Sequence, residues 1–290
     1  MNIQEKQKLT SDWFCNLRDK ICNEFENIER EYLKSNDLPI KPEVKIAKFE
    51  RKKWQRDHQG GDGGFGEMSL MKGNVFEKVG VNFSKVYGEF SEEFCKQIPG
   101  ASKDRRFWAS GISLVAHMRS PLVPAVHMNT RFICTTKSWF GGGADLNPIY
   151  ENEQDVKDFH QVFKKVCDKY SDEYYQKYKK WCDEYFFIKH RNCPRGAGGI
   201  FYDYLDNQNF DDDFSFTKDV GLGFLDIFPK IVRRNMFEKW NDEQREFQFH
   251  KRGQYAEFNL VYDRGTKFGL MTGGNSDAIL MSLPPIAKWS

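Results

Sequence analysis

Residues 113–132 have the sequence SLVAHMRSPLVPAVHMNTRF, which predicts a β-hairpin with two unlike faces. Pro121 and Pro124 lack a backbone N–H and have a fixed φ, so they interrupt the stretch and predict a turn between two strands. Side chains alternate along a strand, so one face collects polar groups and the other is nearly all apolar. The polar face holds Ser113, His117, His127, Asn129 and Arg131; the other holds Ile112, Leu114, Ala116, Met118, Val126, Met128, Thr130 and Phe132.

The pairing register decides which polar residues meet. We expect a hairpin symmetric about Leu122. The polar face is then either a solvated surface with incidental histidines or a functional site, and the second interpretation gains weight if other segments converge on the same face. The expected register pairs His117 with His127, Val115 with Asn129, and Ser113 with Arg131.

Length and composition restrict the class of protein. A chain of 290 residues without a Pro/Ser-rich linker predicts a single domain spanning 1–290. The net charge of +2 argues against binding of nucleic acid through phosphate neutralisation, and no apolar run is long enough to cross a bilayer. Seven cysteines without a Cys-x-x-Cys pair suggest free thiols, and the first residues do not resemble a signal peptide, so we expect a cytoplasmic protein.

Apolar spacing predicts helices over about 8–34, 154–188 and 216–239, with a further short helix before His250. His160 lies at the edge of the apolar stripe of the second helix, and His190 follows the end of that helix. A histidine in either place is often structural.

Glycines and alternating patterns predict the remaining strands. The run Gly60–Gly66 is either a flexible loop or a mobile cover over a site, and residues 67–87 are expected to form short strands with turns near Gly73, Gly80 and Gly88. Residues 254–266, 267–272 and 278–283 are expected to be strands. Helices and antiparallel strands in separate runs indicate an α+β fold.

Several motifs are spread over nearly the whole chain. Together with the histidine hairpin they resemble the oxygen-dependent coproporphyrinogen-III oxidases, which are cofactor-free oxidative decarboxylases of haem biosynthesis. The motifs are VFEKVGVNFS (75–84), WFGGGADLNP (139–148), YKKWCDEYF (178–186), KHRN (189–192), RGAGGIF (195–201), YAEFNLVYDRGT (255–266) and MTGG (271–274).

This resemblance implies a large, flat antiparallel sheet covered by helices on both faces in a single domain. It also implies a homodimer with contacts in a C-terminal strand region at about 255–289. The implied reaction converts two propionates of coproporphyrinogen III to vinyls with molecular oxygen, giving protoporphyrinogen IX, carbon dioxide and hydrogen peroxide. No organic cofactor is implied, and a divalent metal ion is an open expectation.

The resemblance also assigns residues. It implies that His127 is the proton donor, and that substrate is bound by Ser113, by Asn129, Thr130 and Arg131, and by the loop Gly273, Gly274 and Asn275. The family commonly carries arginine at the position of Asn275, so an anchor for a propionate there is expected to be weaker. The metal ligands that it implies are His117, His127, His160 and His190, although structural roles for His160 and His190 remain equally open.

The chemistry of the substrate suggests further candidates. Four propionates require fixed cations, and Arg131, Arg195 and Arg264 each lie in or beside a motif. A carboxylate that accepts hydrogen bonds from the inward pyrrole N–H groups is expected at Asp263 or Asp145, and we expect Asp263 to favour loss of a pyrrole proton. Two other classes stay open: a metallohydrolase using His117 and His127, although no His-Glu-x-x-His motif occurs, and a non-catalytic porphyrin carrier.

Overall fold

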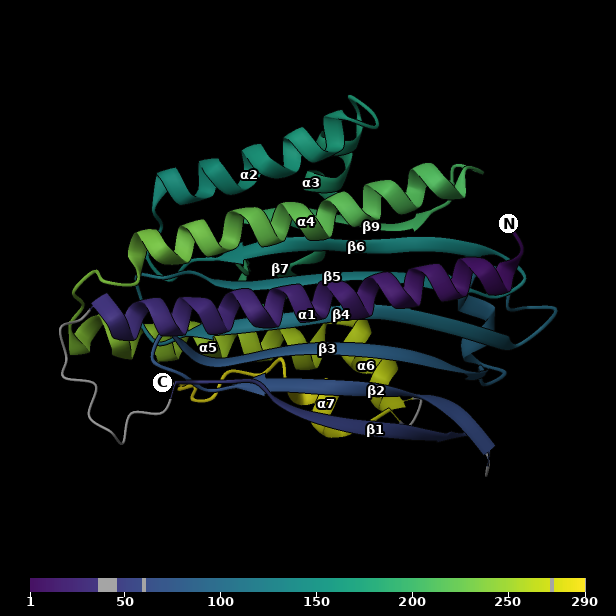
Figure 1. Ribbon diagram of the computed structural model, residues 1–290, viewed down its shortest axis with the longest axis horizontal. Helices are drawn as coiled ribbons and strands as arrows, with labels where there is room; N and C mark the ends of the chain where they lie inside the picture. The colour runs from purple at the N-terminus through teal and green to yellow at the C-terminus, as the bar shows by residue number, and fades with distance from the viewer. Residues whose placement is uncertain (36–45, 59–60, 272–273, 290) are drawn as a thin grey trace.

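A seven-stranded antiparallel sheet forms the middle of the molecule (Figure 1). The computed structural model describes residues 1–35, 46–58, 61–271 and 274–289. The expected α+β fold with one large antiparallel sheet is confirmed. Its strands, in spatial order, are β1 (Glu50–His58), β2 (Gly61–Met71), β3 (Phe76–Glu89), β4 (Arg106–Met118), β5 (Ala125–Cys134), β6 (Ser138–Asn147) and β9 (Gly198–Leu205); β7 (Phe187–Ile188) and β8 (Cys193–Pro194) form a separate pair.

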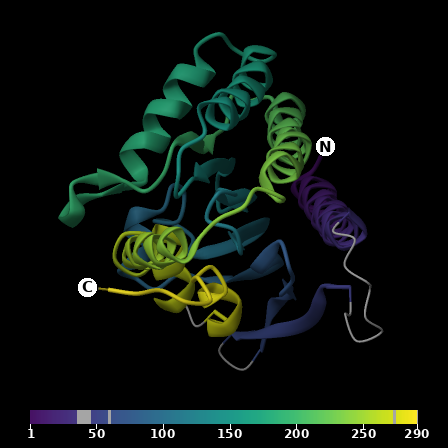
Figure 2. The same ribbon diagram turned by 90° about the vertical axis from the view of Figure 1, so that its left-hand side faces the viewer.

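Helices cover both faces of the sheet (Figure 2). Helices α1 and α4 lie on one face, and α5, α6 and α7 lie on the other. None of the helices in the described ranges is long and apolar enough to cross a membrane. Their bounds are α1 (Ile3–Ser35), α2 (Glu153–Asp168), α3 (Tyr174–Tyr185), α4 (Phe210–Asn235), α5 (Asp242–Val261), α6 (Arg264–Met271) and α7 (Ser276–Leu280), with 3-10 turns η1 (Phe94–Gln97) and η2 (Lys189–Arg191).

The predicted two-faced hairpin is β4 and β5. Along β5 buried and half-buried residues alternate strictly, with Val126, Met128 and Phe132 in the core beneath α1 and α4. His127 and Asn129 lie on the opposite, partly open face, which we call the polar face. The predicted division of residues between the two faces is therefore correct for this hairpin.

The predicted register of the hairpin is wrong by two residues. In the structure Val115 pairs with His127 and Ser113 with Asn129, while His117 has no partner on β5. The end of β4 continues along β3 instead, where His117 pairs with Lys78. Because the error is an even number of residues, every side chain keeps its predicted face.

The expected C-terminal strands are wrong, because residues 254–261 belong to α5 and the segments that follow form α6 and α7. A capping box at Asn241 and Gln244 starts α5, and its buried residues recur at helical spacing, as in Phe249, Arg252 and Tyr255. The alternation of polar and apolar residues over 255–263 was a misleading strand pattern. The single helix expected over 154–188 is likewise two helices, α2 and α3.

Two predictions from glycines are corrected as well. Gly61–Gly66 is neither a loop nor a cover, because it forms the first half of β2 and pairs with β1; Gly60 lies outside the described residues. A Cβ on Gly66 would lie 2.2 Å from the Trp54 ring, so glycine there allows the ring to pack across the strand pair. The turn at Gly73 is confirmed, whereas Gly80 lies in the middle of β3 beneath the Met281 side chain.

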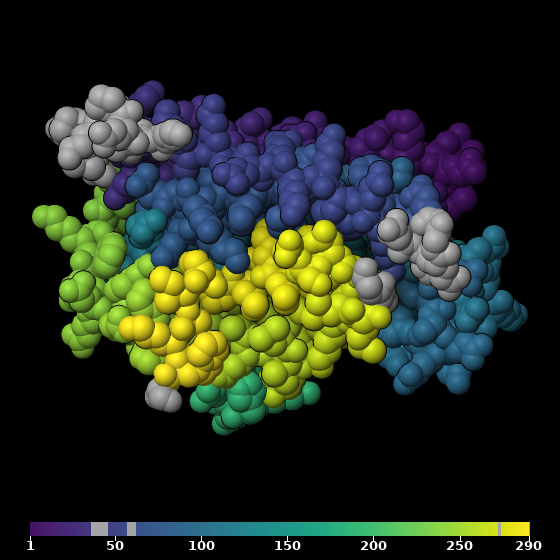
Figure 3. All heavy atoms as spheres, turned by 90° about the horizontal axis from the view of Figure 1, so that it is seen from below, coloured from purple at the N-terminus to yellow at the C-terminus, as the bar shows by residue number. Residues whose placement is uncertain are grey.

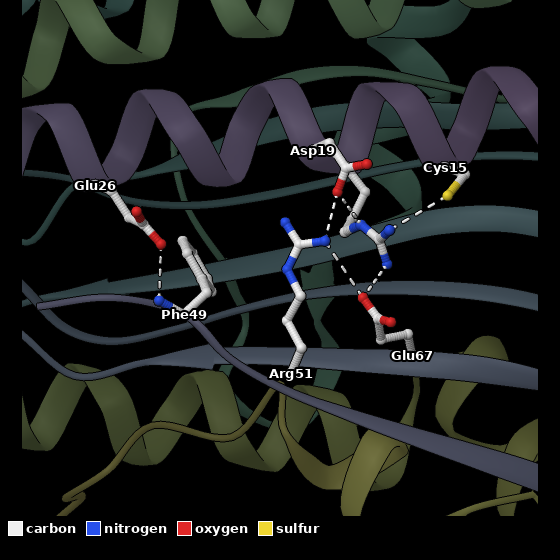
Figure 4. Close-up of polar contacts among 7 residues, drawn as sticks. Cys15, Asp19, Glu26, Phe49, Arg51 and Glu67 are labelled. Carbon is white, nitrogen blue, oxygen red and sulfur yellow. Dashed lines mark hydrogen bonds and ion pairs between the residues drawn. The ribbon is translucent and has the colours of Figure 1, made fainter.

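Polar contacts hold α1 against the edge of the sheet (Figure 4). The Arg18 Nη1 donates to Glu67 Oε1 on β2 at 2.6 Å, and the Arg51 Nη1 on β1 donates to Asp19 Oδ1 at 2.6 Å. Further along, the Glu26 carboxylate accepts the backbone N–H of Phe49. These contacts hold α1 against β1 and β2.

Candidate active site

A histidine and a carboxylate lie opposite each other near the middle of the polar face. His127 on β5 pairs with Asp145 on β6, and the distance between His127 Nδ1 and Asp145 Oδ1 is 2.8 Å. The Nδ2 of Asn129 lies 3.2 Å from the other ring nitrogen of His127. A carboxylate on one imidazole nitrogen fixes the orientation of the ring, and a positioned imidazole is suited to proton transfer.

Arg195 binds the second carboxylate oxygen of Asp145. It precedes β9, and its Nη2 donates to Asp145 Oδ2 at 2.6 Å while its Nη1 donates to Asn259 on α5. Burial opposes ionisation of Asp145, but the charge of Arg195 and the hydrogen bond from His127 outweigh it and lower the pKa of Asp145 to about 2. Asp145 is therefore an anion at neutral pH.

Arg195 is buried beside Asp145 and against an aromatic ring. Only 2% of its side chain is exposed, and its guanidinium lies 3.9 Å from the centre of the Phe186 ring. Arg195 compensates the charge of Asp145, and its expected contact with a propionate of the substrate stays a prediction.

Two other arginines are accessible. The side chain of Arg131 is 29% exposed, and its Nη2 pairs with Asp203 Oδ2 at 2.8 Å. Arg264, at the start of α6, is exposed and lies over the Tyr185 ring. Ser113 is exposed on β4 as well.

Thr130 lies outside this set, because it belongs to the core face of β5 and is fully buried. Its expected contact with substrate stays a prediction. Gly274 and Asn275 precede α7, where the Asn275 side chain accepts the backbone N–H of Ala278 as a helix cap. Gly273 lies outside the described residues.

Asp263 is held at the junction of α5 and α6. Its carboxylate accepts hydrogen bonds from the Tyr185 hydroxyl at 2.9 Å and from the backbone N–H and hydroxyl of Thr266 at 2.7 and 2.8 Å. Burial alone would raise the pKa of Asp263, but the hydrogen bonds from Thr266 and Tyr185 lower it below its usual value. Burial also raises the pKa of Tyr185 to about 12, so the phenol stays a donor.

The remaining histidines have separate partners. His117 is buried with Nε2 2.9 Å from the Ser282 carbonyl oxygen, and burial lowers its pKa to about 3, so it is neutral. The ring nitrogens of His160 lie 3.0 Å from the Ala197 carbonyl oxygen and 3.0 Å from the Tyr175 hydroxyl. His190 contacts the Tyr262 hydroxyl and the Glu257 carboxylate.

Among the residues that the structure describes, no three or more His, Cys, Asp or Glu side chains are arranged to hold a metal ion. His160 and His190 use both ring nitrogens in contacts to other protein groups, and His117 uses its Nε2 in such a contact. The set of four histidines therefore does not fit a common metal site in this arrangement, and we derive no catalytic step from a metal.

Sequence reasoning missed three residues that shape this site. Tyr185 holds Asp263, Asn259 holds Arg195, and Asp203 holds Arg131. Each partner lies more than sixty residues away along the chain, and no local pattern links the two members of a pair. Asp203 lies two residues after the motif RGAGGIF (195–201), which was the local signal near it.

Comparison with known proteins gives a consistent result. A family model described as "Coproporphyrinogen III oxidase" matches residues 10–290. A Rickettsia akari (strain Hartford) protein named "Oxygen-dependent coproporphyrinogen-III oxidase" is 60% identical over 290 residues, which covers 100% of both chains. A protein of the same name from Rickettsia bellii (strain OSU 85-389) is 58% identical over 287 residues, or 99% of each chain.

Proposed function

Because the chain belongs to the coproporphyrinogen III oxidase family, we propose that it is an oxygen-dependent oxidoreductase of haem and porphyrin biosynthesis that converts coproporphyrinogen III to protoporphyrinogen IX. Two propionates become vinyl groups by oxidative decarboxylation, and molecular oxygen is the co-substrate. The similarity to its relatives extends over the full length of both chains, so the whole catalytic unit is compared.

The balance of the reaction states what the protein must provide. Each propionate, with one oxygen molecule and one proton, gives a vinyl group, one carbon dioxide and one hydrogen peroxide. The two electrons that oxygen accepts come from the substrate, so no organic cofactor is required. One proton must be delivered for each vinyl formed, and this demand makes a positioned proton donor useful.

The 2.8 Å contact between His127 and Asp145 is the observation that carries this proposal. We assign delivery of the proton to His127, and orientation of its ring to Asp145. Asp145 is also a candidate for accepting hydrogen bonds from the pyrrole N–H groups. Because its side chain is 2% exposed, it could do so only by giving up one of its present hydrogen bonds. Asp263 is the second candidate for that role.

The accessible cations on the polar face support binding of a tetracarboxylate. Arg131 and Arg264 are assigned to two propionates, with Ser113 and Asn129 as neutral hydrogen-bonding partners. Asn275 and Gly274 are assigned to a third contact beside α7. These assignments rest on exposure and on charge, and substitution of each residue tests them.

We also propose that the active form is a cytoplasmic homodimer. The C-terminal helices expose apolar side chains, including Leu260 at 50% and Met271 at 78%. Large exposed apolar side chains in neighbouring elements are typical of contact surfaces between subunits.

The first experiment compares aerobic and anaerobic incubation of EDTA-treated protein with coproporphyrinogen III. After oxidation of the products, protoporphyrin is quantified. We expect product only with oxygen, and no requirement for an added divalent ion. If activity returns only when such an ion is added, the hypothesis of a histidine metal site is supported again. If no protoporphyrin forms in any condition, a porphyrin carrier is favoured.

A further inference from the structure

A β-bulge interrupts the pairing of β6 with β9. Phe140 pairs with Leu205 and Gly142 with Tyr202, so Gly141 alone faces the two residues Asp203 and Tyr204. Tyr204 has φ of 54°, a left-handed backbone conformation that is rare and unfavourable for a tyrosine. Bulges re-aim the side chains of the bulged strand and often lie beside active sites.

At the bulge, the Asp203 side chain lies against Arg131 next to Gly141, which has no side chain. Asp203 Oδ2 lies 2.8 Å from Arg131 Nη2, and its Oδ1 accepts the backbone N–H of Tyr204 at 3.0 Å. A Cβ on Gly141 would lie 2.7 Å from Asp203 Oδ1 and 3.1 Å from Arg131 Cζ. Any other residue at 141 would therefore displace one member of the pair.

We propose that Asp203 is a positioning residue that holds the Arg131 guanidinium over Gly141 and presents its remaining N–H groups to a carboxylate of the substrate. The inference rests on the proposed role of Arg131 in binding coproporphyrinogen. Asp203 itself is 8% exposed and its two oxygens both have partners, so it acts through Arg131 and not on the ligand.

The physical reason is preorganisation. A half-buried arginine without ligand needs a partner for its charge, and a flexible side chain loses conformational freedom when it binds. Asp203 meets both demands before substrate arrives. The fixed fork of N–H groups then matches a carboxylate in two-point geometry, so recognition depends on direction more than on net charge.

Asp203→Asn tests the inference, because it removes the charge while keeping the size of the side chain. We expect KM for coproporphyrinogen III to rise by about tenfold, the loss expected for one weakened charge-assisted hydrogen bond, with kcat within about twofold. Asp219→Asn is the matched control, because it breaks a 3.0 Å ion pair with Lys169 between helices α2 and α4, away from the polar face. This control is expected to leave KM unchanged.

A double-mutant cycle separates positioning from a merely structural role. In an Arg131→Lys background, which lacks the fork, Asp203→Asn is expected to change KM by less than about twofold. Additive effects of the two substitutions would overturn the inference. It would also fail if Asp203→Asn lowered only the melting temperature, or if KM fell because a repelling carboxylate had been removed.

Anaerobic equilibrium dialysis with coproporphyrinogen III gives Kd for each variant without turnover. Weaker binding by Asp203→Asn in dialysis supports the inference even if the wild-type protein forms no oxygen-dependent product. In that case the oxidase function fails and the positioning role stands. Equal Kd values for wild type and Asp203→Asn overturn the positioning role whatever the assay of turnover shows.

Discussion

At the scale of single residues, burial divides the charged groups of the polar face into two kinds. Asp145 and Arg195 are each 2% exposed and bind each other, whereas Arg131 is 29% exposed and Arg264 is open to solvent. A buried ion pair fixes geometry, because breaking it leaves an uncompensated charge. Arg131, which is half-buried, and Arg264, which is exposed, are proposed to meet a ligand.

Asp145→Asn is expected to lower kcat by about a hundredfold or more, because His127 loses the carboxylate that orients its ring. It should also destabilise the fold by about 3 kcal/mol or more, since Arg195 stays buried without its counter-ion. Oxygen uptake and urea unfolding measure the two effects.

Asp155→Asn is the matched control for that variant. Asp155 is also a buried carboxylate, 2.5 Å from Arg234, and it connects α2 to α4 outside the site. It should lower stability and leave kcat intact. If both variants lose only stability, Asp145 has no place in the chemistry.

Asp263→Asn separates two roles for that carboxylate. The proposed catalytic role predicts a fall in turnover much larger than the change in KM. Its hydrogen bonds to Thr266 predict a loss of about 1 kcal/mol from the start of α6. Steady-state kinetics beside thermal unfolding decide the matter: a lower melting temperature with unchanged kcat would make Asp263 a helix cap alone.

At the scale of elements, α5 is held to the sheet by a buried charge network. Glu77 on β3 pairs with Arg245 at 2.5 Å and with Arg252 at 2.7 Å, both on α5. Arg252 also donates to the Met118 carbonyl oxygen at the end of β4. The helix that carries Asn259 is thereby fixed to the hairpin that carries His127.

This network predicts acid sensitivity. Burial opposes ionisation of Glu77, but hydrogen bonds and charge from Arg245 and Arg252 lower its pKa below the usual 4.5. At a pH between the lowered pKa of Glu77 in the folded protein and 4.5, the unfolded chain binds a proton that the folded chain does not. The stabilisation is therefore complete above pH 4.5 and is lost as the pH falls through the pKa that Glu77 has in the folded protein.

Glu77→Gln should lack this acid-dependent part and should be less stable at pH 7 by about 3 kcal/mol. Urea unfolding at pH 7 and pH 4 measures both quantities. Glu246→Gln is the control, because Glu246 is also on α5 and loses only an exposed pair with Lys288 of the C-terminal segment; it should follow the wild-type pH dependence. An equal acid loss in wild type and Glu77→Gln would contradict the assignment.

At the scale of the whole molecule, the C-terminal helices form much of one outer side (Figure 3). They hold the predicted dimer region, although as helices and not as the expected strands. We expect the protein to sediment at about twice the 34.1 kDa of one chain. Met271→Lys, with Leu260→Lys as a second variant, should shift it toward monomer because a charge is costly to bury in an apolar contact.

Leu222→Lys is the control for these variants, because Leu222 is exposed on α4, on the opposite face of the sheet. It should leave the sedimentation unchanged. A wild-type protein that sediments as a monomer at micromolar concentration would reject the dimer, and unchanged dimers of Met271→Lys and Leu260→Lys would move the interface elsewhere.

The sequence by itself determined the fold class, the two faces of the hairpin and the family. Alternation along a strand is a local property, so His127 and Asn129 keep the predicted face even though the register was wrong by two residues. The tertiary structure alone decided that residues 254–261 are helical, that Arg195 is buried against Asp145, and that Asp203 meets Arg131. These outcomes depend on contacts between segments far apart in the chain, whose distances no local pattern specifies.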